Sequence, residues 1–223
     1  MSIVNTGTNV AALGSAAKSP RGGVSKRAFD IIFGLALLLA FLPLMFFVAL
    51  TIFSFERGPI VFGHDRIGYS GRKFRCLKFR SMVPNAGTVL EEHLSRNPAA
   101  RLEWEASQKL KDDPRITPIG KFLRATSLDE LPQLLNVVRG DMSLVGPRPI
   151  VQAEVARYGG DIDAYTAARP GITGLWQVSG RSDVDYERRV LLDATYVRSW
   201  SLPGDVLILL RTVVVVFSRA GSY

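Results

Sequence analysis

The sequence predicts a helix-rich α/β protein that is associated with a membrane through one apolar element. Three observations lead to this prediction. An uncharged apolar run covers residues 31–55 and has a proline, Pro43, near its centre. The chain after it mixes short alternating strands with amphipathic helices, as a folded domain does. The net charge is +8, and basic residues cluster on both sides of the apolar run.

The composition limits the classes of partner and site. A chain of 223 residues has room for one ordinary domain and a membrane element. The positive charge requires an acidic partner, which is nucleic acid, anionic lipid or a phosphate-bearing substrate. Cys76 is the single cysteine, so an internal disulfide is excluded. His64 and His93 lie far apart without cysteine partners, which argues against a zinc site.

The segment before the apolar run has the composition of a tail. Residues 1–24 are rich in Ser, Gly, Asn and Ala and are mildly basic, so we expect them to be flexible. A cleaved secretory signal is the alternative, but the apolar run is roughly twice the usual length of a signal core and no small-x-small site follows it. The predicted units are therefore a tail (1–24), a membrane helix (25–56) and a folded domain (57–223).

The apolar run allows two membrane topologies. As one straight helix it would measure roughly 37 Å, which is enough to cross a bilayer. Pro43 removes a helical hydrogen bond and predicts a kink between two arms of about a dozen residues, each suited to dipping into one leaflet. Basic residues on both flanks favour placing both ends on the cytoplasmic side. A single crossing and a re-entrant helix both remain open on these grounds.

The motif KRxxD stands at the start of this element. Lys26, Arg27 and Asp30 share one helical face because they are three and four residues apart. The simpler interpretation is an anchor whose basic side chains reach lipid phosphates. The functional interpretation is recognition of the phosphate of a lipid substrate.

A β-hairpin is expected after the membrane helix. Residues 60–62 and 74–79 alternate as strands, and residues 69–71 form the turn between them. Lys78 and Arg80 contribute to a basic surface on the second strand. This surface is either a solvated or head-group-contacting face, or a cradle for phosphate.

Amphipathic helices account for most of the remaining chain. Two are expected in residues 85–110 with an interruption at Pro98, and a short one within residues 116–126. The apolar stretch 205–218 is too short to span a membrane and is expected to pack on the domain or lie at the interface. A further helix covers 185–199, with a buried face formed by Val190, Leu191, Ala194 and Val197.

The most informative polar stretch begins at Ser127. Pro132 belongs in the first turn of a helix, which places Asp129 and Glu130 at or beside the helix N-terminus. Two acids at such a position are commonly caps, because free N–H groups and the helix dipole stabilise carboxylates there. Their alternative role is catalysis, since the same environment attracts phosphates.

Two arginines and a glycine-rich segment support the catalytic alternative. Arg124 lies five residues before Asp129, and Arg148 lies between two prolines that stiffen its backbone, which suits a phosphate ligand. Paired acids beside fixed cations suit a Mg²⁺–diphosphate substrate. The glycines in residues 169–181 would let backbone approach a ligand closely, and Trp176 would either stack on a base or pack in the core.

Together, these motifs resemble those of the bacterial sugar transferases. The similarity rests on KRxxD, the proline-broken apolar run, LKFRSM, DPRITPIGKFLRATSLDELPQLLNVVRGDMSLVGPRP and RPGITGLWQVSGR, and it extends from Lys26 to the C-terminus. The family comprises small monotopic polyprenyl-phosphate phosphoglycosyl transferases that start exopolysaccharide, capsule and glycan assembly. The chain resembles their minimal catalytic unit, so 57–223 would be a small cytoplasmic catalytic domain with amphipathic interfacial helices.

The resemblance implies an enzyme that uses a nucleotide diphosphate sugar, usually a UDP-sugar. It would donate sugar-1-phosphate to undecaprenyl phosphate, a polyprenyl phosphate, and release UMP. UDP-galactose or UDP-glucose is the expected donor, and Mg²⁺ the expected cofactor. Membrane lipid and downstream glycosyltransferases are expected partners, and nucleic acid is not. The enzyme would lie at the bacterial inner (cytoplasmic) membrane on its cytoplasmic face, where nucleotide sugars occur, which favours the re-entrant helix with Pro43 as its point of return.

The resemblance also assigns roles to single residues. Asp129 would attack the β-phosphorus to give a phosphosugar–enzyme intermediate in a ping-pong sequence, and Glu130 would assist through Mg²⁺. Both acids would contact the metal. Donor-phosphate and other substrate contacts are expected from Arg124, Arg148, Lys78, Arg80 and Arg181. The interfacial motif, expected near the lipid phosphate, consists of Lys26, Arg27 and Asp30.

One departure from the family and two competing functions are noted. Many members have Ser-Pro at the helix break, whereas this chain has Leu42-Pro43. A membrane-anchored basic module that binds lipid or nucleic acid without catalysis would also explain the charge. A membrane phosphatase would use the same aspartate with water as acceptor.

Overall fold

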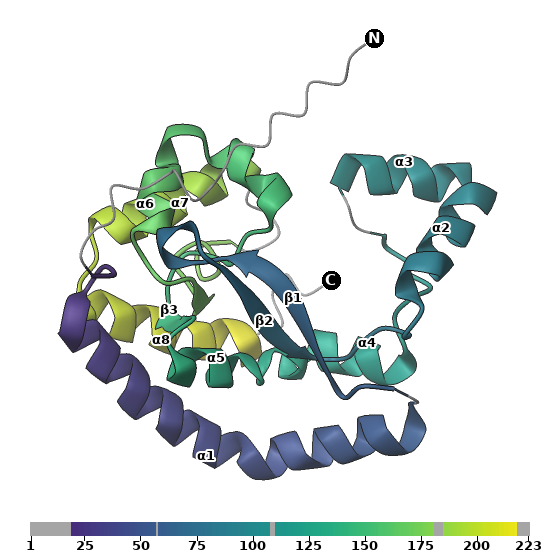
Figure 1. Ribbon diagram of the computed structural model, residues 1–223, viewed down its shortest axis with the longest axis horizontal. Helices are drawn as coiled ribbons and strands as arrows, with labels where there is room; N and C mark the ends of the chain where they lie inside the picture. Colours follow the sequence, from purple (N-terminus) through teal and green to yellow (C-terminus); the bar gives the residue numbers. More distant parts are fainter. Residues whose placement is uncertain (1–18, 57, 108–109, 181–184, 218–223) are drawn as a thin grey trace.

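The computed structural model describes residues 19–56, 58–107, 110–180 and 185–217. Helices surround two small sheets (Figure 1). The strands are β1 (Val61–Ile67), β2 (Lys73–Phe79), β3 (Ser143–Val145) and β4 (Gly171–Thr173). The α-helices are α1 (Gly23–Phe55), α2 (Ala86–Arg96), α3 (Pro98–Ser107), α4 (Pro118–Ala125), α5 (Gln133–Arg139), α6 (Ile162–Thr166), α7 (Tyr186–Arg198) and α8 (Leu202–Phe217). Three 3₁₀ segments are η2 (Tyr69–Gly71), η3 (Leu128–Glu130) and η4 (Gln152–Asp161).

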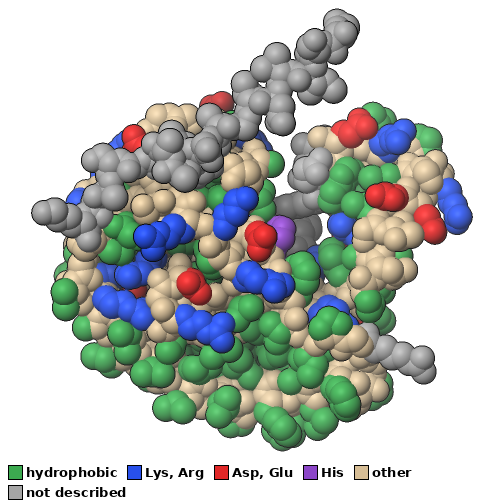
Figure 2. Space-filling model, in the orientation of Figure 1, with side chains coloured by type: hydrophobic (Ala, Val, Ile, Leu, Met, Phe, Trp, Pro, Cys, Tyr) green, Lys and Arg blue, Asp and Glu red, His purple; other side chains and the backbone are tan. Residues whose placement is uncertain are grey.

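Helix α1 forms the apolar floor of the molecule. It is the one helix in the described ranges that is long and apolar enough to cross a membrane. Figure 2 shows hydrophobic side chains gathered along the lower face, over α1. Phe33, Leu39, Phe46 and Phe53 are among those exposed to solvent. Such a surface is stable only against lipid or another apolar partner, so it supports membrane association.

The helix begins at Gly23, two residues before the expected start, and includes Pro43. Helical structure continues through this proline, so it does not divide α1 into two separate helices. In Figure 1 the helix changes direction near its middle and curves beneath the rest of the chain. A bend is the expected effect of a residue that lacks the N–H for an i→i−4 hydrogen bond.

The expected hairpin is present, with a longer first strand than the pattern predicted. Strands β1 and β2 pair antiparallel from Val61 opposite Phe79 to Ile67 opposite Lys73. The segment η2 connects them, with Ser70 in the left-handed region at φ 56°. The short apolar run at residues 60–62 marked only the beginning of β1, because the strand continues through polar residues that pair with β2.

The helices expected in the middle of the chain are also present. Helices α2 and α3 are separated at Asn97, directly before Pro98, as the proline predicted. They form an arm that stands away from the body of the molecule in Figure 1. Thr117 is the N-cap of α4 and directly precedes it. Its hydroxyl accepts a hydrogen bond from the Gly120 N–H at 2.9 Å.

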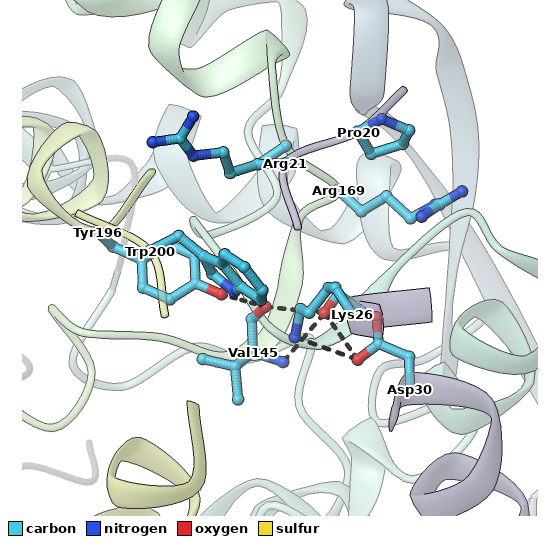
Figure 3. Close-up of a pocket in the computed structure, with 10 residues that line it drawn as sticks. Pro20, Arg21, Lys26, Asp30, Val145, Arg169, Tyr196 and Trp200 are labelled. Carbon is cyan, nitrogen blue, oxygen red and sulfur yellow. Dashed lines mark hydrogen bonds and ion pairs between the residues drawn. The ribbon is translucent and has the colours of Figure 1, made fainter. Parts of the chain in front are cut away.

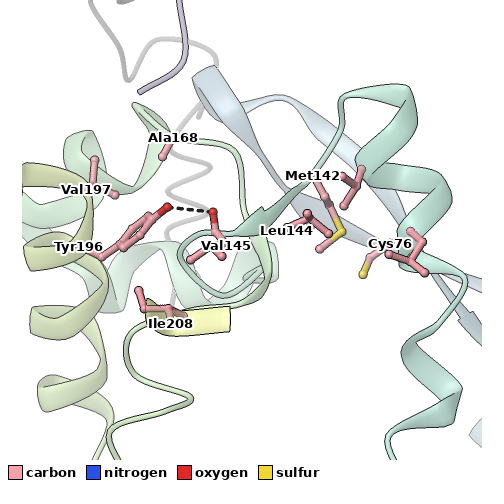
Figure 4. Close-up of a cluster of buried hydrophobic side chains, with 10 residues drawn as sticks. Cys76, Met142, Leu144, Val145, Ala168, Tyr196, Val197 and Ile208 are labelled. Carbon is pink, nitrogen blue, oxygen red and sulfur yellow. Dashed lines mark hydrogen bonds between the residues drawn. The ribbon is translucent and has the colours of Figure 1, made fainter. Parts of the chain in front are cut away.

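The main core lies where α5, α7, α8 and the parallel pair β3–β4 meet (Figure 4). Val137, Met142, Leu144 and Val145 supply its centre, and the Tyr196 hydroxyl donates to the Val145 carbonyl at 2.9 Å. Cys76 from β2 is buried against this cluster.

One of the four core residues predicted on α7 is wrong. Val190, Ala194 and Val197 are buried as expected, but Leu191 is 47% exposed. The buried stripe instead includes Asp193, which is 1% exposed. Successive residues differ by about 100° in direction, and this step takes Leu191 past the Ala194 edge of the stripe, on the side away from Asp193.

A buried ion cluster fixes the start of α1 to the domain (Figure 3). The Lys26 ammonium lies 3.2 Å from the Asp30 carboxylate and 2.8 Å from that of Asp205 on α8. Asp30 also accepts hydrogen bonds from the Ser143 hydroxyl and the Leu144 N–H. Asp205 accepts two more, from the side chains of Tyr196 and Trp200. These contacts compensate for burying three charges.

Arg27 makes a second connection between α1 and the domain. Its guanidinium donates to the carbonyls of Val137 and Val138, both at 2.7 Å. These carbonyls belong to the last turn of α5, where a cation satisfies free acceptors and complements the helix dipole.

We predict that Lys26→Met destabilises the fold strongly. Removing the ammonium leaves two buried carboxylates without their shared counterion, which costs about 3–5 kcal/mol in the free energy of unfolding. Denaturant unfolding of the protein in detergent measures the change. Lys73→Met is the matched control, because Lys73 is exposed on β2. Equal stabilities of the two variants would contradict this account of the cluster.

Candidate active site

Asp129 and Glu130 lie in the 3₁₀ turn η3, directly before α5. Pro132 is the N-cap residue of α5, so the predicted relation between the proline, the acids and the helix start is confirmed. Ser127 begins the turn in the left-handed region at φ 58°. This tight turn connects α4 to α5, and the Asp129 side chain within it is largely buried.

Lys78 on β2 connects the two acids. Its ammonium lies 2.6 Å from Glu130 Oε1 and 3.7 Å from Asp129 Oδ2. Asn136, 1% exposed on α5, holds the strand and the helix in this register. Its side-chain oxygen accepts from the Leu77 N–H at 3.0 Å, and its amide nitrogen donates to the Arg75 carbonyl at 2.9 Å. The sequence analysis did not identify Asn136, because its partners lie some sixty residues earlier in the chain.

The two carboxyl groups have opposite pKa shifts. Burial raises the pKa of Asp129, and the charges of Lys78 and Arg124 only partly oppose this effect. Burial would also raise the pKa of Glu130, but the charge and hydrogen bond of Lys78 outweigh it, so that pKa is lowered. Glu130 is therefore a fixed anion, whereas Asp129 is a less stabilised and more nucleophilic carboxylate.

Arg124 lies beside the dyad. Its Nε donates to the Ser81 hydroxyl at 2.9 Å, which orients the guanidinium on α4. Burial lowers the Arg124 pKa, and among the neighbouring charges Asp129 opposes that effect most. The structure thus brings Arg124 to the acids as the sequence predicted.

Arg148 acts electrostatically on Glu130 and lies against an aromatic ring. Its guanidinium is 5.4 Å from the Trp176 ring centre, and that of Arg189 is 5.1 Å from the same ring. Burial and the Arg189 charge lower the Arg148 pKa, and Glu130 is the largest opposing charge. Trp176 is 9% exposed, so it is a core residue that supports the arginines.

Arg66 is a further basic residue that the sequence analysis treated only as part of a charged flank. It donates to the Pro149 carbonyl at 3.2 Å, next to Arg148, and lies 3.8 Å from Glu154. Its charge helps to lower the Glu130 pKa. Strand pairing was needed to find it, because Arg66 reaches this site only through the register of β1 with β2.

The site has an excess of positive charge. Five acids act on these groups, Asp113, Asp129, Glu130, Glu154 and Asp193, and six cations do, Lys78, Arg66, Arg115, Arg124, Arg148 and Arg189. The cations therefore outnumber the acids. Repulsion among partly buried guanidinium groups is relieved by a ligand with several negative charges, such as a diphosphate.

The glycine-rich segment has a different role from the one expected. A Cβ atom on Gly171 would lie 2.1 Å from the Gly146 backbone nitrogen, and one on Gly174 would lie 2.2 Å from the Gly146 carbonyl oxygen. These glycines therefore allow two parts of the chain, rather than chain and ligand, to approach closely. The contact fixes the backbone just before Arg148.

Two predicted substrate-binding residues are not placed at the dyad. Arg80 is 6% exposed and pairs with Glu56 at the end of α1, at 3.2 Å from its carbonyl and 3.5 Å from its carboxylate. Strand β2 ends at Phe79, so the alternation that places Lys78 at the acids does not extend to Arg80. Arg181 lies outside the described residues.

The KRxxD residues form a separate cluster from the dyad. Lys26 is 4% exposed and Asp30 is fully buried, and both are occupied by protein partners. Lys26 is therefore not a side chain that extends along lipid to a head group. The described contacts hold the start of α1 against the domain. Contact of these residues with a lipid phosphate stays a prediction.

Comparison with known proteins identifies the family of the chain. Residues 21–219 match the family model described as bacterial sugar transferase. The chain belongs to the bacterial sugar transferase family. The match includes the KRxxD cluster, the dyad and the arginine-bearing segments, so it covers every feature described above.

Several members of the family with curated names are similar. The UDP-galactose-lipid carrier transferase of Erwinia amylovora is 56% identical over 89% of this chain, and the undecaprenyl-phosphate galactose phosphotransferase of Salmonella typhimurium is 54% identical over 89%. The chain spans 41% of the length of each. The exopolysaccharide production protein ExoY of Sinorhizobium fredii is 49% identical, over 92% of this chain and 90% of its own length.

Proposed function

We propose that this bacterial sugar transferase moves sugar-1-phosphate from a UDP-sugar, UDP-galactose or UDP-glucose, to undecaprenyl phosphate and releases UMP. This would be the first membrane step of exopolysaccharide assembly. The observation that carries the proposal is the Asp129–Glu130 dyad, held by Lys78 among an excess of arginines, on a domain seated on an apolar helix. The names of the relatives support the donor and the acceptor.

In the first half-reaction, a carboxylate oxygen of Asp129 attacks the β-phosphorus of the donor. A new oxygen–phosphorus bond forms, the bond from that phosphorus to the bridging oxygen breaks, and UMP leaves with the electron pair. Arg124 acts on Asp129 and Arg148 on Glu130, and both would neutralise the phosphate oxygens. Lys78 favours the ionised form of Glu130 and holds the two acids next to each other, because its ammonium contacts both.

In the second half-reaction, an oxygen of the polyprenyl phosphate attacks the phosphorus of the phosphosugar–aspartate. The bond to Asp129 breaks, and the carboxylate is restored. The product is the lipid diphosphate sugar. Because UMP can leave before the lipid phosphate enters, one set of cations would serve both ligands in turn.

Asp129 and Glu130 would also hold Mg²⁺. No group of three or more metal-binding side chains occurs among the described residues, so the ion would need oxygens from the substrate. Two carboxylates with a diphosphate are a typical ligand set for Mg²⁺. Lys78 contacts one oxygen of each acid, which leaves the second oxygens for the metal. The ion would contribute charge neutralisation of the leaving UMP.

The contacts of α1 support a re-entrant topology. Near its start, Lys26 binds Asp205 of α8. Near its end, Ile52 packs in one buried cluster with Phe79 and Leu123 of the same domain. A helix that crossed the bilayer would carry its two ends to opposite sides, so a domain that holds both ends favours a helix that returns, bent at Pro43. Consumption of nucleotide sugars would place this domain on the cytoplasmic face of the inner membrane.

We expect Asp129→Asn to lower turnover by at least about 10³-fold, because the amide cannot form the phosphosugar intermediate. UMP release from UDP-galactose and UDP-glucose, with undecaprenyl phosphate and Mg²⁺, measures the loss, and adding EDTA to the wild type tests the metal. Asp65→Asn on exposed β1 is the control. Wild-type turnover in Asp129→Asn would refute the assignment of the nucleophile.

The pH profile should report the raised pKa of Asp129. The ionised carboxylate is the nucleophile, so kcat falls as the pH drops through that pKa, which lies above the ordinary value of 3.8. Lys78→Met removes the nearest compensating charge and should move this acidic limb to higher pH. An acidic limb that Lys78→Met leaves in place would show that another group controls it.

Topology is tested by labelling cysteines in right-side-out and inverted membrane vesicles. In a Cys76→Ser background, Ser15→Cys and Ser222→Cys should react with an impermeant reagent from the same, cytoplasmic side. Reaction from opposite sides would establish a single crossing and overturn the re-entrant proposal.

A further inference from the structure

An exposed aromatic pair on β1 is not used by the chemistry described above. Phe62 is 54% exposed, and its ring lies 6.2 Å from that of His64 at an interplanar angle of 28°. The two residues share one face of the strand because they are two positions apart. A single exposed hydrophobic side chain needs no partner by itself, so the argument for a ligand depends on what surrounds Phe62.

Strand register places this pair beside the dyad. Phe62 is directly opposite Lys78 in the β1–β2 hairpin. Opposite residues of an antiparallel pair project to the same side, with their Cβ atoms about 5 Å apart. The Lys78 ammonium contacts both acids, so Phe62 flanks the lysine that marks the reacting centre. Figure 2 shows a hollow between the body of the molecule, near β1, and the α2–α3 arm.

The charges on this face match the donor. Arg66 and Lys78 share the face with the aromatic pair and would attract the diphosphate. Burial and the Arg66 charge lower the pKa of His64, so its imidazole is neutral at neutral pH and offers one hydrogen-bond donor and one acceptor. A planar base with carbonyl and imide groups would stack on the ring of Phe62 and bond to such an imidazole.

We propose that Phe62 and His64 form the subsite for the pyrimidine base of the nucleotide donor. This inference rests on the proposed function. It adds a binding site for the base, which is the end of the donor farthest from the sugar. Stacking on an exposed aromatic ring is tolerant of small movements, so the hairpin would position the base while Lys78 and the arginines hold the diphosphate. Phe62 is therefore a specificity residue, and it takes no part in bond making.

Contact with the membrane is the other explanation for an exposed phenylalanine. On the same face His64, Arg66 and Lys78 are polar or charged, and its two apolar residues, Cys76 and Phe74, are packed against the core. The exposed surface of α1, by contrast, is apolar. Val61, also exposed, projects to the opposite face of the hairpin. The composition of the face therefore favours a charged, aromatic ligand over lipid.

The test compares Phe62→Leu, Phe62→Tyr and Val61→Ala in the full-length protein. Phe62→Leu should weaken equilibrium binding of UMP, measured by calorimetry, about tenfold and raise the donor KM by a similar factor at unchanged kcat. Phe62→Tyr keeps the ring and should remain near wild type, as should Val61→Ala. Inhibition by inorganic pyrophosphate, which has no base, should be equal in all four proteins.

Three results would overturn the base subsite. The first is unchanged UMP binding in Phe62→Leu. The second is a loss of pyrophosphate inhibition in Phe62→Leu as large as its loss of UMP binding. The third is reduced binding of Phe62→Leu to anionic lipid vesicles with an unchanged donor KM, which would identify a lipid contact. Failure of the proposed function has a different signature. The wild type would then release no UMP from a UDP-sugar, while direct UMP binding would still report whether Phe62 holds the base.

Discussion

The structure depends first on one lysine that two buried carboxylates share. Lys26 belongs to a helix whose outer surface needs lipid, and Asp205 belongs to the last helix of the domain. A buried ion pair gives little net stability, but it is highly specific about geometry, because every misaligned arrangement leaves a charge without a partner. The cluster therefore determines how the membrane element is seated against the domain. Two further contacts extend this control along α1: Arg27 with carbonyls of α5, and Arg80 with Glu56.

The attachment of α1 to the domain also determines the position of the candidate active site. Helix α5 is held to α1 by Arg27 and to β2 by the hydrogen bonds of its own Asn136, and the dyad precedes its first turn. The depth of α1 in the lipid thus sets the height of Asp129 above the apolar surface. For the proposed acceptor, whose phosphate would stay at the head-group level, the central requirement would be this coupling of a membrane element to the turn that carries Asp129.

Local signals in the sequence were sufficient for α1, the hairpin, most of the longer helices and the position of the two acids before α5, but not for the parallel pair β3–β4. Pro132 marked the start of α5, Pro98 the junction of two helices, and alternation the hairpin. What could not be predicted depends on contacts between distant parts of the chain. Nothing local distinguishes a lysine that reaches lipid from Lys26, whose second partner lies at the other end of the sequence. Likewise, the purpose of Gly171 became apparent only with Gly146 opposite it.

The crowding of Arg66, Arg148 and Arg189 around one end of the dyad has a consequence for evolution. Without a polyanion these guanidinium groups repel one another, so the empty site lowers the stability of the fold that carries it. Substitutions that relax this repulsion would make the resting protein more robust and a poorer binder of phosphates. Selection for activity therefore opposes selection for stability at these positions.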